Sequence, residues 1–195
     1  MPARVIAITG GIGAGKSVLS RMLRCLGYDV LDCDSEAKRL MDSDASIKQR
    51  IALEVDAAAI LPDGSIDRAR LASTVFADAA ALGRLNAIVH GAVRRRITEW
   101  RINIEADVAF VETAILYQSS LNREVDAEWR VVAPAELRVE RVMLRNGLSR
   151  EAVLQRLASQ RYEPAPGEPR PPLTEFVNDN RTPLLPQLLR CLEIN

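Results

Sequence analysis

A nine-residue segment near the N-terminus has residue types and spacings that could bind phosphate. It reads Thr9-Gly10-Gly11-Ile12-Gly13-Ala14-Gly15-Lys16-Ser17, and its last eight residues match the pattern G-x-x-x-x-G-K-S. Glycines let the backbone curl tightly and point several N–H groups at one anion. We expect Lys16 to reach the β- and γ-phosphates of a nucleotide and the Ser17 hydroxyl to bind Mg²⁺. The residues expected at the nucleotide are Gly11, Gly13, Ala14, Gly15, Lys16, Ser17 and Val18.

The residues on either side of this loop distinguish a functional motif from a glycine-rich turn with a chance lysine. Before the loop, residues 5–8 form a short apolar run suited to a buried strand. After it, apolar residues recur at helical spacing, at Val18, Leu19, Met22, Leu23 and Leu26. The positive end of that helix would add to the field on bound phosphates. A strand, this loop and a helix in succession favour the functional interpretation.

Carboxylates follow two further apolar runs. Asp32 and Asp34 come after residues 28–31, and Glu112 follows residues 108–111. Open α/β sheets bind ligands at the carboxyl ends of their strands, so we expect Asp32 to face the γ-phosphate as a general base or through magnesium. We expect Asp34 mainly to cap the following helix and also to touch substrate. Glu112 suits a position near magnesium or the substrate, or alternatively a cap on the next segment.

Residues 42–105 interrupt the alternation of strands and helices with a purely helical pattern. Apolar residues between Leu85 and Trp100 recur on one face of a long helix. His90 and Arg94 lie one turn apart on it, which suits the binding of an anionic substrate. The alternatives are a structural histidine and an arginine on a solvated face.

A second arginine-rich stretch begins at Pro134, since proline is tolerated in the first turn of a helix. Arg138, Arg141 and Arg145 follow at i, i+3, i+7 spacing, and the helix is expected to break at residues 146–147. Arginines on two hinged helices are typical of a lid that closes over phosphates, because the bidentate donors then arrive with the nucleotide. Ordinary surface arginines are the alternative.

Composition limits the class of protein. The 195 residues carry 26 basic and 26 acidic side chains and no run of 18 apolar residues, so we expect neither a nucleic-acid partner nor a membrane span. One histidine excludes a multi-histidine metal site, and three cysteines without metal-ligand spacing fit reduced thiols in a cytoplasm. Residues 163–172 hold half of the ten prolines and are expected to form a stiff surface connector. We expect a monomer or a weak homo-oligomer.

With these segments in hand, the chain closely resembles dephospho-coenzyme A kinases over nearly its whole length. The loop alone is common to many kinases, whereas the other segments in combination are much more selective. The segments that carry the resemblance are Thr9–Ser17, residues 32–39 (DCDSEAKR), residues 85–90 (LNAIVH), the Arg141-x₃-Arg145-Asn146-Gly147-Leu148-Ser149 stretch, Arg156-x₃-Gln160 and Asn178-Asp179.

The resemblance implies an ATP-dependent transfer of the γ-phosphoryl group to the ribose 3′-hydroxyl of dephospho-coenzyme A, the final step of coenzyme A biosynthesis. It also implies an α/β fold of the P-loop NTPase type, with three layers, a five-stranded parallel sheet, a helical substrate insertion and a lid. The expected core comprises residues 1–41, 106–138 and 173–195. Residues 42–105 would be the substrate domain, and residues 139–172 the lid and proline-rich connector.

The resemblance also implies roles for individual residues. Asp32 would activate or orient the 3′-hydroxyl, while His90 and Arg94 would contact dephospho-coenzyme A. The nucleotide phosphates would meet Arg141 and Arg145, and the adenine would lie near Asn178. One departure concerns Gln118, which stands where the family commonly has a glutamate, so we expect no catalytic role for it.

Two other functions remain open from the residues themselves. The chain could be another small-molecule P-loop kinase, such as a nucleoside monophosphate kinase. It could also be a nucleotide-binding regulatory module that changes shape without transferring phosphate. A GTPase switch is disfavoured because the sequence has no N-K-x-D guanine-binding motif.

Overall fold

A computed structural model describes residues 2–194, which form two compact units. The first unit takes in the chain up to Asp32 and again from Arg101 onward, and the second unit is Cys33–Trp100. The chain therefore leaves the first unit directly after Asp32 and returns to it at the end of a long helix. The helical unit as the structure defines it begins at Cys33, and the functional division at residue 42 stays a proposal.

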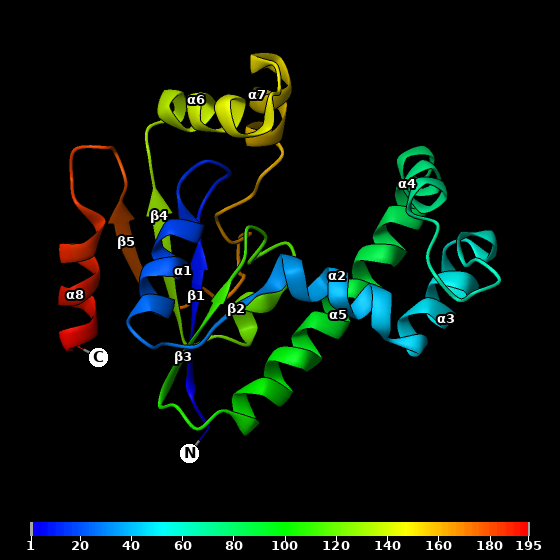
Figure 1. Cartoon of the computed structure of the whole chain (residues 1–195), viewed down its shortest axis with the longest axis horizontal. Coiled ribbons are helices and arrows are strands. Elements are labelled where there is room, and N and C mark those ends of the chain that lie inside the picture. The colour runs from blue at the N-terminus through cyan, green and yellow to red at the C-terminus, as the bar shows by residue number, and fades with distance from the viewer. Residues whose placement is uncertain (1, 195) are drawn as a thin grey trace. The chain divides into compact units, whose positions relative to one another are not determined.

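The first unit is built on a five-stranded parallel sheet with the strand order β2-β3-β1-β4-β5 (Figure 1). This confirms the expected α/β fold and sheet. The first two strands of the chain, β1 and β2, lie on either side of β3, and the later strands β4 and β5 follow on the other side of β1. The strands are β1 Arg4–Thr9, β2 Val30–Asp32, β3 Val108–Glu112, β4 Ala127–Val132 and β5 Leu173–Val177.

One face of the sheet is covered by α1 and α8. A row of aromatic side chains crosses that face, with ring centroids 5.0 Å apart between Phe110 and Trp129 and 5.0 Å apart between Trp129 and Phe176. Leu19 of α1 and Leu188 of α8 pack into the same buried cluster. This apolar face fixes the position of α1, which begins where the glycine-rich loop ends. The helices of the unit are α1 Lys16–Cys25, α6 Ala135–Asn146, α7 Arg150–Ala158 and α8 Leu184–Ile194, with a short 3₁₀ turn, η2 Leu121–Arg123.

The helical unit has a core of its own. Ile47, Ile51, Leu71 and Ile88 are buried together, which confirms the apolar patterns that predicted these helices. Among residues 2–194, no helix combines the length and the apolar composition that crossing a bilayer requires. The elements are α2 Cys33–Ser43, α3 Ala45–Glu54, η1 Ala57–Ala59, α4 Arg68–Ala77 and α5 Ala79–Asn103, of which the residues up to Trp100 lie in this unit.

The expectation that Asp34 caps a helix is wrong. The helix α2 already begins at Cys33, so Asp34 lies inside its first turn as one of two acidic residues there. An acid in the first turn still interacts favourably with the positive end of the helix dipole. The cause of the miss is that β2 runs directly into α2, with no intervening residue to serve as a cap.

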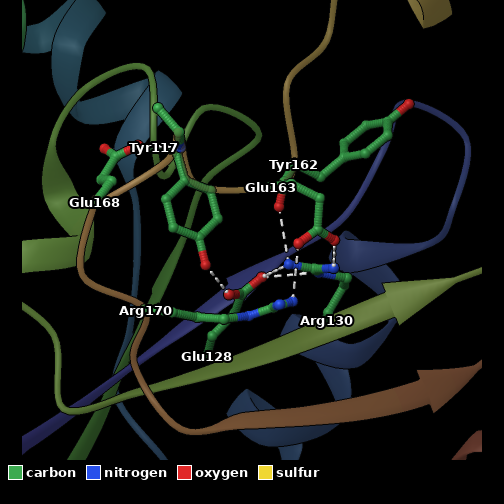
Figure 2. A network of polar contacts seen from close by, with 8 residues as sticks. Tyr117, Glu128, Arg130, Tyr162, Glu163, Glu168 and Arg170 are labelled. Atoms are coloured by element: carbon green, nitrogen blue, oxygen red, sulfur yellow. Dashed lines mark hydrogen bonds and ion pairs between the residues drawn. The ribbon is translucent and has the colours of Figure 1, made fainter.

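The opposite face of β4 carries a buried ionic network (Figure 2). Glu128 is fully buried and Arg130 is 6% exposed, and the Nε atom of Arg130 donates to Glu128 over 2.8 Å. The hydroxyl of Tyr117 donates to Glu128, and burial together with this carboxylate raises the pKa of the phenol. Arg130 also pairs with Glu163, which in turn pairs with Arg170 over 3.1 Å. Every charged group in the network thus has a partner of opposite sign.

The proline-rich connector is fastened by this network and by its own backbone. As expected, residues 163–172 contain neither helix nor strand. Two backbone carbonyls attach this connector to the rest of the unit: the C=O of Pro172 accepts the N–H of Glu128 over 2.8 Å, and the C=O of Pro169 accepts from Asn122 over 2.9 Å. Pro171 is buried. The connector therefore packs along the sheet face that α1 and α8 leave open.

We predict that Arg130→Met destabilises the protein by about 3–5 kcal/mol, because removing one partner leaves a buried carboxylate uncompensated. Denaturant unfolding followed by circular dichroism measures the change. The matched control is Arg150→Met, which breaks the exposed pair between Arg150 and Glu136 and should leave the unfolding midpoint close to that of the wild type. Equal midpoints for the two variants would contradict the assigned role of the network.

Candidate active site

The glycine-rich loop leaves β1 at Thr9 and ends where α1 begins at Lys16. It passes beneath α6 at the carboxyl ends of the strands (Figure 1). Gly15 is the residue before α1 and has a φ of 106°, a conformation that residues with side chains rarely adopt. A Cβ atom at this position would lie 2.1 Å from Nδ2 of Asn178. Position 15 therefore requires glycine for two separate reasons, the positive φ of its backbone and the close approach of Asn178.

The two polar residues of the motif occupy the first turn of α1. The Nζ atom of Lys16 donates to the C=O of Gly10 over 2.8 Å, which turns the ammonium group back over the loop. Ser17 is exposed, and α1 has no acidic residue in its first turn. No acidic side chain in the first turn of α1 therefore offsets the positive end of this helix, which favours a bound anion at this place.

The two carboxylates predicted from the strand ends lie on neighbouring strands. Asp32 is the last residue of β2 and stands in register with Glu112, the last residue of β3. Glu112 is in turn in register with Ile8, which directly precedes the first residue of the loop segment. Asp32, Glu112 and the start of the loop therefore follow one another along the carboxyl edge of the sheet.

Two of the residues expected at the nucleotide contact the loop backbone. Nδ2 of Asn178 donates to the C=O of Ala14 over 2.7 Å, and Arg141 donates to the C=O of Gly13 over 3.3 Å. Arg141 also donates to the C=O of Asn178 over 3.1 Å, so the two side chains join the loop to the turn after β5. Arg145 lies one turn further along α6, is exposed and donates to the side chain of Asn146 over 2.8 Å. Its contact with a phosphate stays a prediction.

Of the residues expected at the acceptor substrate, Glu112 lies in the first unit, whereas Asp34, His90 and Arg94 lie in the helical unit. His90 is partly buried on α5, and burial followed by the charge of Arg94 lowers the pKa of its imidazole, which favours the neutral form of the ring. Asp34 is exposed on α2. Arg96, on the same helix as His90, is paired with Glu36 over 2.9 Å and so has a structural partner.

Two residues contact the loop backbone in a way that the sequence did not predict. Arg138 and Gln160 both contact Ile12, from α6 and from the segment after α7. The arginine spacing and the Arg156-x₃-Gln160 pattern drew attention to these stretches, but neither pattern indicates which backbone atoms the side chains reach. Only the folded chain brings residues so far apart in sequence together.

Comparison with known proteins identifies the relatives of this chain. The family model for dephospho-CoA kinase matches residues 4–184. A dephospho-CoA kinase of Porphyromonas gingivalis is 38% identical over 188 residues, covering 96% of this chain and 92% of the relative. A Thermus thermophilus protein of known crystal structure is 35% identical with a TM-score of 0.75, covering 100% of this chain and 96% of that one. The dephospho-CoA kinase of Campylobacter jejuni, at 22% identity and a TM-score of 0.63 over 97% of this chain and 94% of that one, has the same fold.

We predict that Gly15→Ala weakens ATP binding at least about tenfold, since a left-handed conformation alone costs an ordinary residue roughly 1–2 kcal/mol and the new Cβ atom would also displace Asn178. Isothermal calorimetry with ATP measures the effect. Gly83→Ala is the control, because no atom lies within 4 Å of a Cβ atom there and the residue is helical. An ATP affinity of Gly15→Ala equal to that of this control would disprove the assigned geometry.

Proposed function

The chain belongs to the dephospho-coenzyme A kinase family and phosphorylates the ribose 3′-hydroxyl of dephospho-coenzyme A with ATP, and we propose that Asp32 acts on that hydroxyl while the glycine-rich loop holds the ATP. The observation that carries the proposal is the strand register. It aligns Asp32 with Glu112, and Glu112 with the residue before the loop. The catalytic carboxylate and the phosphate site thereby share one edge of the sheet.

In the proposed site the loop supplies the fixed positive field for ATP. The backbone N–H groups from Gly13 to Ser17 and the N-terminus of α1 surround the β-phosphate, and Lys16 reaches from there toward the γ-phosphate. Arg141 and Asn178 lie at the outer side of the loop, which suits contacts with the phosphates and the adenine. Arg145 would join them when the lid closes.

The reaction requires in-line positioning and charge neutralisation more than covalent participation of the protein. A bond forms between the 3′-oxygen and the γ-phosphorus, while the bond from that phosphorus to the β–γ bridging oxygen breaks. The proton of the hydroxyl passes to the carboxylate of Asp32, which acts as general base. ADP leaves with the negative charge of the broken bond, and Lys16 stabilises this charge as it develops.

We propose that Mg²⁺ accompanies ATP. Among residues 2–194 no cluster of three or more His, Cys, Asp or Glu side chains could hold a metal by itself. Mg²⁺ is commonly bound through few protein ligands, several waters and the phosphates of the substrate. Ser17, exposed in the first turn of α1, would supply the protein oxygen, with Glu112 nearby on the sheet edge. Bound Mg²⁺ neutralises phosphate charge during transfer.

We further propose that residues 42–105 bind the acceptor. Arg94 suits an anionic group of dephospho-coenzyme A. His90, whose pKa is lowered by burial and by the charge of Arg94, can exchange hydrogen bonds with the same substrate. Asp34 would touch the acceptor from α2. The thiols of Cys25, Cys33 and Cys191 support a proposed cytoplasmic location. A monomeric or weakly oligomeric state remains a prediction.

We expect Asp32→Asn to lower kcat by about 10²–10⁴-fold, the usual contribution of a general base, because asparagine keeps the shape but not the basicity. Asp34→Asn should be much milder, since the amide is isosteric and the acid lies in an exposed first turn. Steady-state kinetics with separate calorimetry for ATP distinguishes the two. If Asp34→Asn is the more damaging variant, the catalytic carboxylate is misassigned.

Replacement of Arg94 tests whether the helical unit binds dephospho-coenzyme A and not ATP. Arg94→Ala should raise the KM for dephospho-coenzyme A by about tenfold or more, as loss of a charge-assisted hydrogen bond implies, and leave the KM for ATP nearly unchanged. Arg68→Ala, an exposed arginine of the same unit that pairs with Asp42, serves as the control. A change confined to the KM for ATP would refute the acceptor assignment.

A further inference from the structure

Ile12, inside the phosphate loop, is held on both sides by residues far away in sequence. Its N–H donates to Oε1 of Gln160 over 2.7 Å, and its C=O accepts from Nε of Arg138 over 3.0 Å. Arg138 lies on α6 and Gln160 follows α7. The G-x-x-x-x-G-K-S pattern contains neither residue, so these contacts are additional to the motif.

The guanidinium of Arg138 lies directly against the loop. A Cβ atom on Gly11 would come within 2.0 Å of its Nη2 atom, so this close approach depends on glycine. The side chain of Ile12 packs against an apolar cluster formed by α6 and α7, whose buried members are Val139, Val142 and Val153. The loop is therefore attached to the proposed lid through its backbone and through one side chain.

Arg138 is itself held in place by contacts with Tyr162. Nη2 of Arg138 donates to the hydroxyl of Tyr162 over 3.1 Å, and its guanidinium carbon lies 5.5 Å from the centre of the tyrosine ring. The C=O of Tyr162 accepts from Nη2 of Arg130 over 2.8 Å (Figure 2). A continuous path of polar contacts thus leads from the buried pair of Arg130 and Glu128 to the phosphate loop.

We propose that Gln160 and Arg138 are positioning residues that keep the phosphate loop in its nucleotide-binding shape. The inference rests on the proposed function, because it requires this loop to bind ATP. Each residue acts through the backbone of Ile12 and needs no contact with the nucleotide. Holding the loop before ATP arrives reduces the entropy lost on binding, so the anchors raise the affinity for ATP and ADP and leave the acceptor site unaffected.

The test compares Gln160→Met with Gln155→Met by calorimetry. Methionine has nearly the length of glutamine but cannot accept the N–H of Ile12 effectively, and Gln155 is an exposed glutamine on α7. Loss of one hydrogen bond should raise the Kd for ATP and for ADP by about 2- to 10-fold in Gln160→Met. The Kd for dephospho-coenzyme A, the Tm and all values for Gln155→Met should stay close to those of the wild type.

Arg138→Lys provides a second, independent variant. Lysine keeps the positive charge, but it lacks the planar guanidinium that donates to Ile12 and to Tyr162 at the same time. Weaker ATP binding by this variant would therefore not result from a loss of charge. If Gln160→Met does not fold, Arg138→Lys alone tests whether the contacts with Ile12 raise the affinity for ATP. Unchanged ATP and ADP affinities in the folded variants would overturn the inference, as would a lowered Tm with equal weakening of both substrates. A wild-type protein that binds no ATP would instead overturn the proposed function.

Discussion

A phosphate loop can point its N–H groups at an anion only while other contacts hold its own backbone in a sharply curled shape. In this protein β1 fixes one end of the loop and α1 the other, and both are packed into the aromatic-lined core of the sheet. Between these ends, Asn178 holds the C=O of Ala14, and Arg138 and Gln160 hold Ile12. The anion site thus depends on residues from four separate parts of the chain.

The ionic network on β4 also contributes to holding the phosphate loop in shape. A buried ion pair is by itself weak support for stability, because desolvation offsets much of the attraction. Here Arg130 connects Glu128 with Glu163 and with the backbone of Tyr162, and β4 is paired directly with β1. The network thereby fixes where the chain runs after α7.

Much of the fold could be predicted because its signals are local. The strand, loop and helix around Lys16 are contiguous, and the apolar runs of β1 and β3 identify these segments as buried strands without knowledge of their neighbours. The positions of Asp32 and Glu112 followed from the ends of the strands alone.

Other features could not be predicted. The prediction of a helix cap at Asp34 was wrong because β2 passes into α2 without a linking residue. Burial of Arg130 could not be foreseen, since an isolated arginine in a strand ordinarily faces solvent. The bond between Gln160 and Ile12 spans 148 residues, and no local pattern encodes it.

The central claim is that the phosphate loop and Asp32 together catalyse transfer of the γ-phosphoryl group of ATP to the ribose 3′-hydroxyl of dephospho-coenzyme A. The most direct test is a coupled ADP-release assay with ATP and Mg²⁺ across dephospho-coenzyme A, AMP, CMP and shikimate, with the product position identified by phosphorus NMR. The account predicts turnover with dephospho-coenzyme A far above that with the other three acceptors, and phosphate on the ribose 3′-oxygen. Faster turnover with any other acceptor, or ADP release without phosphorylation of dephospho-coenzyme A, would contradict it.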